Sequence, residues 1–382
     1  MTALFVLFAG SVMSQRTYLP DGRPQGRPRN LYVHFPFCRR KCTYCALHSK
    51  AGTDRAERDF YVAQIAREIE RLETDGFDTV YFGGGSPALC DLVPVLRAVR
   101  PLLGKNAEFT VELNPLDLSD GGRVDVSDGG RLLDVLEDGG VNRISMGMQS
   151  LDSETLADMG RGYDPEFAES AFALVKSRYS NAGIDLIAGY PRTGAKGGQR
   201  AAPRLPNGWG LAHCSVYSLM VEEGTALWCQ VQSGRKIPDD DEALDEIKRI
   251  SAHLKAQGLE RYEISNYAVP GKECRHNMAV WRGEDYFGLG EGARGRIGLA
   301  RTEDAGTPSA RSVEVSPEED ALERTIFMLR TREGLNPAAR PGWEETLGGY
   351  AAEGLLVRVP DGRYRLTERG TEVCDTILAA LV

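Results

Sequence analysis

The feature that most constrains this chain is a group of three cysteines at the end of a short apolar segment. Residues 31–37 read Leu-Tyr-Val-His-Phe-Pro-Phe, and Cys38, Cys42 and Cys45 follow directly. The β-branched and aromatic residues predict a buried strand that delivers the cysteines to a loop at its carboxyl end. A structural zinc site needs four protein ligands, and beyond Cys45 only His48 lies close enough in sequence to be a fourth. Three thiolates suit a 4Fe–4S cluster with one iron open to a small molecule, and incidental cysteines are the alternative.

Composition places this loop in a large globular chain. The 382 residues, 42% of them hydrophobic, are enough for one large domain and one small one. The net charge of -9 provides no global basic field for nucleic acid or anionic lipid, so we expect no nucleic-acid partner. The 8 cysteines lack the density and spacing of a disulfide scaffold. An accessible cluster would not survive oxidation, and we therefore expect a reducing, cytoplasmic location.

The first residues resemble a targeting signal only superficially. The apolar stretch 3–10 has no Lys or Arg before it and is too short to span a bilayer, so we expect no transmembrane segment. We expect residues 1–12 to precede the true start, with Met13 as the second candidate, and a short tail that touches a membrane is the alternative. Residues 1–30 as a whole are expected to be a flexible lead-in, because the part after Met13 is rich in Pro, Gly and Arg.

From residue 31 onward the chain alternates strand-like segments with amphipathic, helix-like segments, the pattern of a parallel α/β sheet covered by helices. Strands are expected at 31–37, 77–82, 108–115, 141–150, 183–191 and 213–222, and helices at 54–72, 165–179 and 239–257. Two acids, Glu112 and Asp185, lie inside apolar strands. A buried carboxylate costs several kcal/mol unless it is paired or hydrogen-bonded, so we expect Glu112 to point into a barrel; an exposed edge charge is the alternative.

Two segments are unusually rich in glycine. Gly83, Gly84 and Gly85 follow the second expected strand and precede Ser86. Such a run lets the backbone pass close to a ligand and exposes N–H and C=O groups, although alone it is usually only a turn. The second segment is a tandem repeat over residues 117–132. Its copies are too short to fold as units, so we interpret it as a small duplication in a surface loop.

Taken in order, the motifs resemble the coproporphyrinogen III oxidase-like branch of the radical S-adenosylmethionine (SAM) family. The matching motifs are the cysteine loop, the glycine run, Glu-x-Asn-Pro, Asn-Arg-Ile-Ser-x-Gly-x-Gln-Ser and Ile-Asp-Leu-Ile-x-Gly. The resemblance implies an α/β fold with a partial (β/α)6 radical SAM barrel over residues 31–299 and a small winged-helix-like α+β domain over 318–382. The polar segment 300–317 reads as a linker between them.

The resemblance also implies the cofactor contacts. Cys38, Cys42 and Cys45 would hold the 4Fe–4S cluster, whose open iron would take the amino and carboxylate groups of SAM. Tyr32 would reach the methionine carboxylate, and Tyr44 would lie against the adenine. The full set of residues implied for SAM is Tyr32, Tyr44, Gly83, Gly84, Gly85, Ser86, Glu112, Gln149, Arg161 and Asp185. If the family reaction operates, an electron from the cluster cleaves SAM to methionine and a 5'-deoxyadenosyl radical.

A later passage resembles the HemW-type heme chaperones and related oxidases. It contains Tyr-Glu-Ile-Ser-Asn and Cys-x-His-Asn, with Val280 where tyrosine is usual. A neutral His276 would suit heme iron as an axial ligand, and Trp281 could stack on the macrocycle. A hydrogen-bonded structural role for His276 is the alternative. His213 and Cys274 are weaker ligand candidates.

Two differences favour a chaperone over an oxidase. The decarboxylating oxidases carry a further cysteine two positions after the third, where this chain has Leu47, and they have a longer amino-terminal segment. We therefore expect a heme chaperone that delivers heme to hemoproteins of unknown identity. An oxygen-independent coproporphyrinogen III oxidase and another radical SAM enzyme are the alternatives. A homodimer and a peripheral membrane contact stay open.

The chain departs from the family pattern over residues 192–210. Its four charged residues there are all basic, and several Gly and Pro make the usual helix doubtful. Such a loop could contact propionates or phosphate, and a solvated loop is the alternative.

Overall fold

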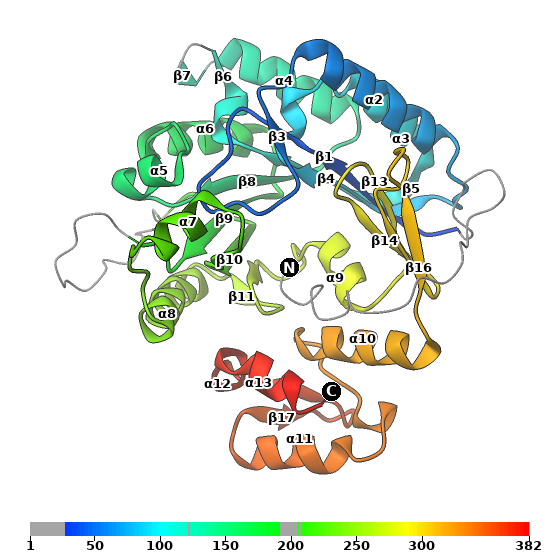
Figure 1. The fold of residues 1–382 in the computed structure, drawn as a ribbon, viewed down its shortest axis with the longest axis vertical. Helices are drawn as coiled ribbons and strands as arrows, with labels where there is room; N and C mark the ends of the chain where they lie inside the picture. The colour runs from blue at the N-terminus through cyan, green and yellow to red at the C-terminus, as the bar shows by residue number, and fades with distance from the viewer. Residues whose placement is uncertain (1–26, 121–122, 125, 192–204, 206–207, 382) are drawn as a thin grey trace.

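A curved nine-stranded sheet forms the centre of the protein (Figure 1). The structure, a computed structural model, describes residues 27–120, 123–124, 126–191, 205 and 208–381. Six parallel strands neighbour one another in chain order: β1 (Asn30–Phe35), β4 (Phe77–Gly84), β5 (Leu103–Leu113), β8 (Arg143–Gln149), β9 (Ala182–Ala188) and β10 (His213–Ser218). This confirms the expected α/β fold with a parallel sheet.

Short strands extend the sheet at both edges. β13 (Phe287–Leu289) runs parallel beside β1. At the other edge, β12 (Asn266–Ala268) pairs antiparallel with β10, and β11 (Glu260–Arg261) pairs antiparallel with β12. The segment with the second family signature therefore closes one side of the curved sheet.

Helices cover the convex face of the sheet (Figure 1). They are α2 (Arg55–Glu70), α3 (Val93–Val99), α4 (Val126–Asp138), α6 (Pro165–Arg178) and α8 (Asp240–Ala256). Asp54 caps α2, since its carboxylate accepts the N–H of Glu57 at 2.8 Å. The strand residues beneath these helices, such as Val33, Val80 and Ile144, are fully buried.

The opposite, concave face of the sheet is polar and only partly buried. Side chains alternate between the two faces along each strand, so every second residue points away from the covering helices. The partly buried residues of this face are Tyr32, Tyr81, Glu112, Gly147, Asp185 and Tyr217. We call the surface formed by these residues, and by the other strand residues that point the same way, the concave face.

The carboxyl-terminal part packs beneath the concave side (Figure 1). It comprises α10 (Pro317–Leu329), α11 (Trp343–Ala352), the hairpin β17 (Leu356–Arg358) and β18 (Tyr364–Leu366), α12 (Glu368–Glu372) and α13 (Cys374–Ala379). Its apolar core also contains Cys274, Met278 and Trp281 around α9 (Arg275–Trp281). This part therefore shares its core with the end of the barrel region.

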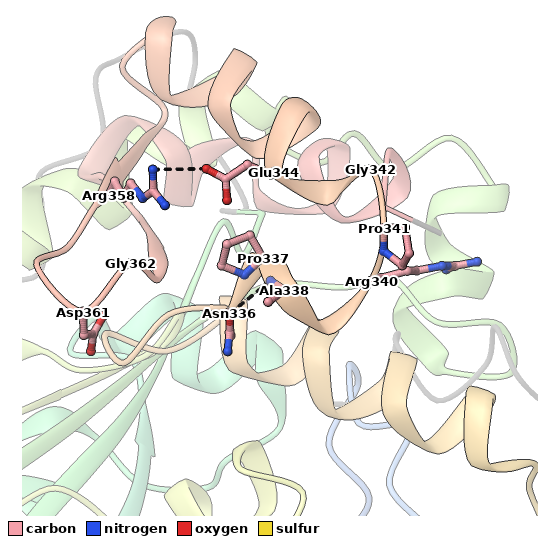
Figure 2. A pocket seen from close by; sticks show the side chains of 10 residues that line it. All are labelled: Asn336, Pro337, Ala338, Arg340, Pro341, Gly342, Glu344, Arg358, Asp361 and Gly362. Carbon is pink, nitrogen blue, oxygen red and sulfur yellow. Dashed lines mark hydrogen bonds and ion pairs between the residues drawn. The ribbon is translucent and has the colours of Figure 1, made fainter.

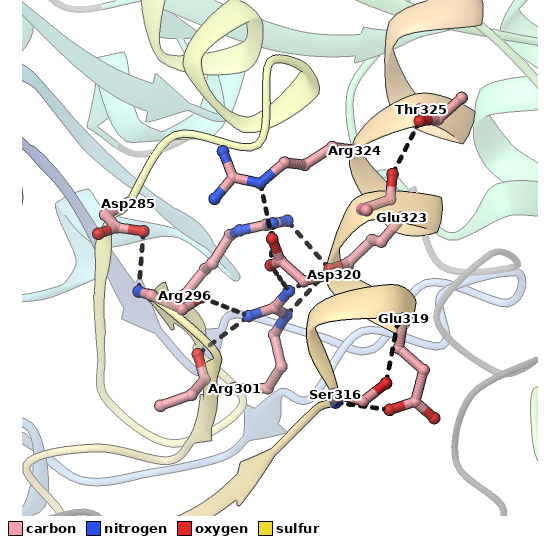
Figure 3. Close-up of polar contacts among 12 residues, drawn as sticks. Asp285, Arg296, Arg301, Ser316, Glu319, Asp320, Glu323, Arg324 and Thr325 are labelled. Carbon is pink, nitrogen blue, oxygen red and sulfur yellow. Dashed lines mark hydrogen bonds and ion pairs between the residues drawn. The ribbon is translucent and has the colours of Figure 1, made fainter. Parts of the chain in front are cut away.

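Two expectations about irregular segments are wrong. Residues 300–317, expected to be a linker, contain β15 (Ala300–Glu303) and β16 (Arg311–Glu314), which form a sheet with β14 (Arg294–Ile297). Ion pairs rather than apolar residues join this small sheet to α10, which explains the polar composition (Figure 3). The second copy of the tandem repeat, expected in a loop, lies largely in α4, because a helix tolerates its two glycines once Leu133 and Leu136 are buried.

Some expectations fall outside the described residues. These are the start at Met13, the lead-in up to residue 26 and most of the basic segment 192–210. Within the part of the chain that the structure describes, no helix is both long and apolar enough to cross a membrane.

Candidate functional site

The cysteine loop lies at the carboxyl end of β1. Cys38 ends β2 (Phe37–Cys38), and Cys42 and Cys45 follow in a turn closed by the Cys45 N–H, which donates to the Cys42 carbonyl at 3.2 Å. All three thiols are free and partly exposed. Burial raises the pKa of the Cys38 and Cys45 thiols, and neighbouring thiols raise both further. The loop therefore gathers three thiols at one edge of the sheet.

This donor set fits a cluster better than a single metal ion. Among the described residues, no three His, Cys, Asp or Glu side chains converge closely enough to hold one ion. A tetrahedral zinc ion needs such convergence, whereas cysteines around a 4Fe–4S cluster bind separate irons. His48, the nearest imidazole in sequence, contacts Glu291 at 3.3 Å instead.

The glycine run ends β4 next to this loop. Gly84 has a φ of +109°, and a Cβ there would lie 2.7 Å from the His34 ring. The Gly84 N–H donates to Oε2 of Glu112 at 3.2 Å. Gly83 is equally confined, because its Cβ would lie 3.0 Å from the Glu112 carboxyl group and the Tyr81 ring.

Gly85 and Ser86 contact the cysteine loop and its support. A Cβ on Gly85 would overlap the Phe37 carbonyl oxygen and would lie 2.9 Å from Sγ of Cys38. Ser86 is buried and donates its hydroxyl hydrogen to Asp117 at 2.7 Å. The run therefore lets protein groups approach closely at the place where a ligand was expected.

Two carboxylates occupy the concave face. Glu112 accepts hydrogen bonds from Tyr81 Oη at 2.7 Å and from the Gly84 N–H, so it is not an exposed edge charge. Asp185 accepts from Ser145 Oγ at 3.1 Å. Burial, together with the nearby Asp185 charge, raises the pKa of Glu112 to about 7. Burial also raises the pKa of Asp185. Glu112 can therefore hold a proton near neutral pH, and either acid can bind a cationic group.

Arg161 and Gln149 lie at the edge of the sheet that carries the cysteines. Arg161 donates to the Gly147 carbonyl at 2.6 Å and to Tyr163 Oη at 2.9 Å, and its Nη1 lies 3.5 Å from Sγ of Cys42. Gln149 has a φ of +67° where the register of β8 and β9 shifts. Such strain in a residue other than glycine is typical of functional sites.

The two tyrosines expected at the site lie apart from each other. Tyr32 contributes to the concave face, with its ring centroid 6.0 Å from that of Tyr81 and its Oη 2.9 Å from Nδ1 of His34. Tyr44 lies in the cysteine loop, edge-on to Tyr190 at 6.3 Å between ring centroids. Tyr32 therefore lies on the concave face, whereas Tyr44 lies at the edge of the sheet that carries the cysteines.

His276 lies under the concave face at the side opposite to the cysteines. The residue is 4% exposed, and its Nδ1 lies 2.8 Å from Thr79 Oγ1. Thr79 donates its hydroxyl hydrogen to Asn30 Oδ1 at 2.8 Å, while the Asn30 amide donates to the Asp285 carbonyl. His276 Nδ1 must then carry the hydrogen, which leaves Nε2 as an acceptor. Burial lowers the pKa of His276 to about 3, so the ring is neutral.

Three other candidates are used structurally. Trp281 packs edge-on to Phe327 at 5.5 Å within the carboxyl-terminal core, so the expectation that it stacks on a macrocycle is wrong. His213 Nε2 lies 2.8 Å from Tyr262 Oη. The Tyr262 hydroxyl also accepts the Cys274 N–H at 3.2 Å, and His213 and Cys274 are both buried.

Tyr81 and Arg143 were not among the residues expected at the site from the sequence. Tyr81 holds Glu112, and Arg143 shares the inward alternation of Ser145 along β8. Each lies an even number of positions before a residue that was expected at the site. Side chains an even number of positions apart on a strand point to the same face, and this alternation is the signal that would have identified both residues.

The carboxyl-terminal part carries a separate surface hollow of about 500 Å³ (Figure 2). Residues before α11 and residues of the hairpin turn line it, including Pro337, Arg340 and Asp361. None of the residues expected at the site lines this hollow, and we assign no role in the site to it.

Comparisons with known proteins agree with this arrangement. The chain matches the Radical SAM superfamily over residues 32–195. It is 32% identical to the heme chaperone HemW of Mycobacterium tuberculosis, over 95% of this chain and 97% of that protein, and 34% identical to the heme chaperone HemW of Escherichia coli, over 71% and 70%. The coproporphyrinogen III oxidase structure from Escherichia coli, described as a radical SAM enzyme, shares the fold with a TM-score of 0.72 at 19% identity, covering 92% of this chain and 89% of that one. The chain therefore belongs to the HemW heme chaperone family, within the radical SAM superfamily.

Proposed function

We propose that this protein binds heme together with a 4Fe–4S cluster and SAM, and that it delivers heme to client hemoproteins in the cytoplasm. The observation that carries the proposal is the position of the three thiols directly beside a polar concave face. Similarity to heme chaperones over 95% of the chain supports the same function.

In this proposal Cys38, Cys42 and Cys45 hold the cluster, which when bound would supply a single electron. Glu112 and Asp185 would accept hydrogen bonds from the SAM ammonium group or ribose. A nearby ammonium would keep Glu112 ionised, because an opposite charge lowers the pKa that burial raises. Arg161 would bind a carboxylate group.

The remaining contacts would orient SAM along the same edge. The backbone of Gly83, Gly84 and Gly85, together with Ser86, would lie near its amino group. Tyr32, Tyr44 and Gln149 would contact its carboxylate, adenine and ribose side. The position of Tyr44 in the cysteine loop and the strained backbone of Gln149 support these roles.

His276 is our candidate for the axial ligand of heme. Its support is the neutral ring, whose Nε2 has no hydrogen-bond partner among the described residues. Because the ring is buried beside Tyr32 and Tyr81, heme could reach it only if α9 or these aromatic side chains moved. Leu47, 45% exposed, occupies the position at which the related oxidases carry a cysteine, which favours the chaperone.

The test is to incubate the anaerobically reconstituted protein separately with heme and with coproporphyrinogen, supplying SAM and a reductant with the coproporphyrinogen. We expect about one heme per chain, seen as a Soret band, and no decarboxylated porphyrin product. Steady formation of protoporphyrinogen without stable heme binding would overturn the proposal in favour of the oxidase. The variant His276→Ala should shift the Soret band, whereas His253→Ala, on α8, should not. An unchanged spectrum in His276→Ala would remove the ligand assignment alone.

A further inference from the structure

Arg143, the first residue of β8, points toward the concave face. Its strand neighbours Ile144 and Met146 are fully buried under the helices, whereas Ser145 binds Asp185 on the inner side. Alternation along a strand places Arg143 on the same side as Ser145. In the register of the sheet, Arg143 lies opposite Thr110, which in turn lies opposite Tyr81.

Among the described residues, the guanidinium of Arg143 has no ion-pair partner, although, against the effect of burial, the charge of the nearby Glu108 raises its pKa. The residue is 1% exposed, and its one hydrogen bond is a long contact of 3.4 Å to Thr110 Oγ1. Its Nε is buried without a partner, and no described carboxylate forms an ion pair with it. An unpaired buried ion costs several kcal/mol, so such a group calls for a partner.

The nearby acids form no direct pair with Arg143, and neutral donors bind them instead. Glu108 Oε1 accepts the His276 N–H at 3.2 Å and the Cys274 thiol at 3.6 Å. Glu112 and Asp185 are held by Tyr81, Gly84 and Ser145, as described above. By contrast, the chain pairs another deeply buried guanidinium, that of Arg296, with both Asp320 and Glu323.

We propose that Arg143 receives a carboxylate of a ligand bound against the concave face. A guanidinium presents a planar fork of donors that matches a carboxylate with two parallel hydrogen bonds. This inference rests on the proposed function, which brings two carboxylate-bearing molecules to the protein. They are heme, through its propionates, and SAM, through its methionyl carboxylate.

The position of Arg143 favours a propionate. The thiols and Gln149 mark the carboxyl ends of the strands, whereas Arg143 begins β8 at the opposite end. Six residues of strand at about 3.3 Å each separate Arg143 from Gln149, roughly 20 Å. His276 lies on the same side as Arg143, with its ring centroid 5.3 Å from that of Tyr81. One molecule that carries both a metal and carboxylates could therefore engage both residues.

The experiment compares the affinities of the full-length protein for heme, heme dimethyl ester and SAM. Esterification removes the charge of the propionates and keeps the macrocycle. We expect Arg143→Gln to weaken heme binding at least tenfold while binding of the ester and of SAM is unchanged, and Arg143→Lys to be intermediate. The control Arg178→Gln removes an arginine that pairs with Asp134 and Glu137, and it should alter none of the three affinities.

The other outcomes are equally decisive. A loss of SAM affinity in place of heme affinity would support the carboxylate site and identify the methionyl carboxylate as its ligand. Unchanged affinity for both molecules, or equal weakening of heme and its ester, would overturn the inference. If Arg143→Gln does not fold, the ratio of heme to ester affinity in Arg143→Lys decides in the same way. Absence of heme binding by the unmutated protein would overturn the proposed function, and the SAM measurements would still decide the role of Arg143.

Discussion

At the scale of single residues, the inner polar side chains are held by one another. Tyr81 and the Gly84 N–H both donate to Glu112, and Ser145 donates to Asp185. These hydrogen bonds satisfy both carboxylates. The pKa of each is nevertheless raised, because burial disfavours the charged form. The protein's own donors therefore orient both carboxylates, and the charge of Glu112 depends on pH.

Glu112 should make the stability of the apo-protein depend on pH. Its pKa is about 7 when folded and 4.5 as the ordinary value, so between these values the folded chain keeps a proton that the unfolded chain releases. A rise in pH across this range should therefore lower the free energy of unfolding by up to about 3 kcal/mol. Glu112→Gln should remove this part of the dependence, and urea unfolding from pH 4.5 to 8 measures it. Parallel stability curves for the two proteins would contradict the raised pKa.

The three cysteines of the loop should be individually necessary for the cluster. Replacing Cys38, Cys42 or Cys45 by Ala should reduce the content of about four irons per chain to near zero after anaerobic reconstitution. Cys229→Ser is the matched control because Cys229 is exposed and distant in sequence from the loop. Iron and sulfide assays measure the result, and a full cluster in Cys42→Ala would refute the assignment.

The sequence predicted best those residues whose chemical role is apparent from a short motif. Glu112 was expected to point inward because an acid among apolar strand residues needs partners, and the structure confirms this direction. Arg143 was missed because nothing local distinguishes an unpaired buried arginine from a paired one. Trp281 was misjudged because its partner Phe327 lies in a distant helix that no local pattern connects to it.

At the scale of elements, the ends of the strands carry the residues of the candidate site. The parallel strands and the helices α2, α6 and α8 lie close to their expected positions because alternation and capping residues encode them locally. The segment 300–317 was mistaken for a linker because its strands carry few apolar residues. Its sheet depends instead on charged residues whose partners lie in α10, beyond the reach of periodicity.

The end of β4 should tolerate no side chain at Gly84. Its φ of +109° and the 2.7 Å approach of His34 mean that Gly84→Ala should lower the free energy of unfolding by about 1–3 kcal/mol and weaken SAM binding. Gly52→Ala is the control, because Gly52 also has a positive φ but nothing within 4 Å of its Cβ. Denaturant unfolding and binding isotherms measure both effects. Equal results for the two variants would exclude the contact with His34 as the cause.

At the scale of the whole molecule, the carboxyl-terminal part and the barrel region form a joint structure. They share the core around α9, and β14 and β15 are tied to α10 by Arg296 and Arg301 (Figure 3). Because α9 also carries His276, a displacement of the carboxyl-terminal part would act directly on the heme ligand candidate. Contacts between distant segments, which no sequence pattern specifies, thus connect the two regions.

Asp320 is the centre of this connection, and its charge should stabilise the whole chain. It accepts hydrogen bonds from Arg301 at 2.7 Å and from Arg324 at 2.8 Å, and it also pairs with Arg296, whose side chain is 3% exposed. Asp320→Asn would leave that buried guanidinium short of a counter-charge, so we expect a loss of about 3 kcal/mol in the free energy of unfolding. Asp361→Asn, which breaks the exposed pair with Arg363, should cost far less, because solvent screens an exposed ion pair.

Thermal unfolding and limited proteolysis would separate these two cases. For Asp320→Asn we expect a lower melting temperature and faster cleavage around residues 304–316, because α10 would be held less firmly against the small sheet. The loss should persist in high salt, since a buried pair is screened far less than an exposed one. If Asp320→Asn and Asp361→Asn behaved alike, the ion pairs would not be what joins the carboxyl-terminal part to the barrel region, and the shared apolar core around α9 would have to hold them together alone.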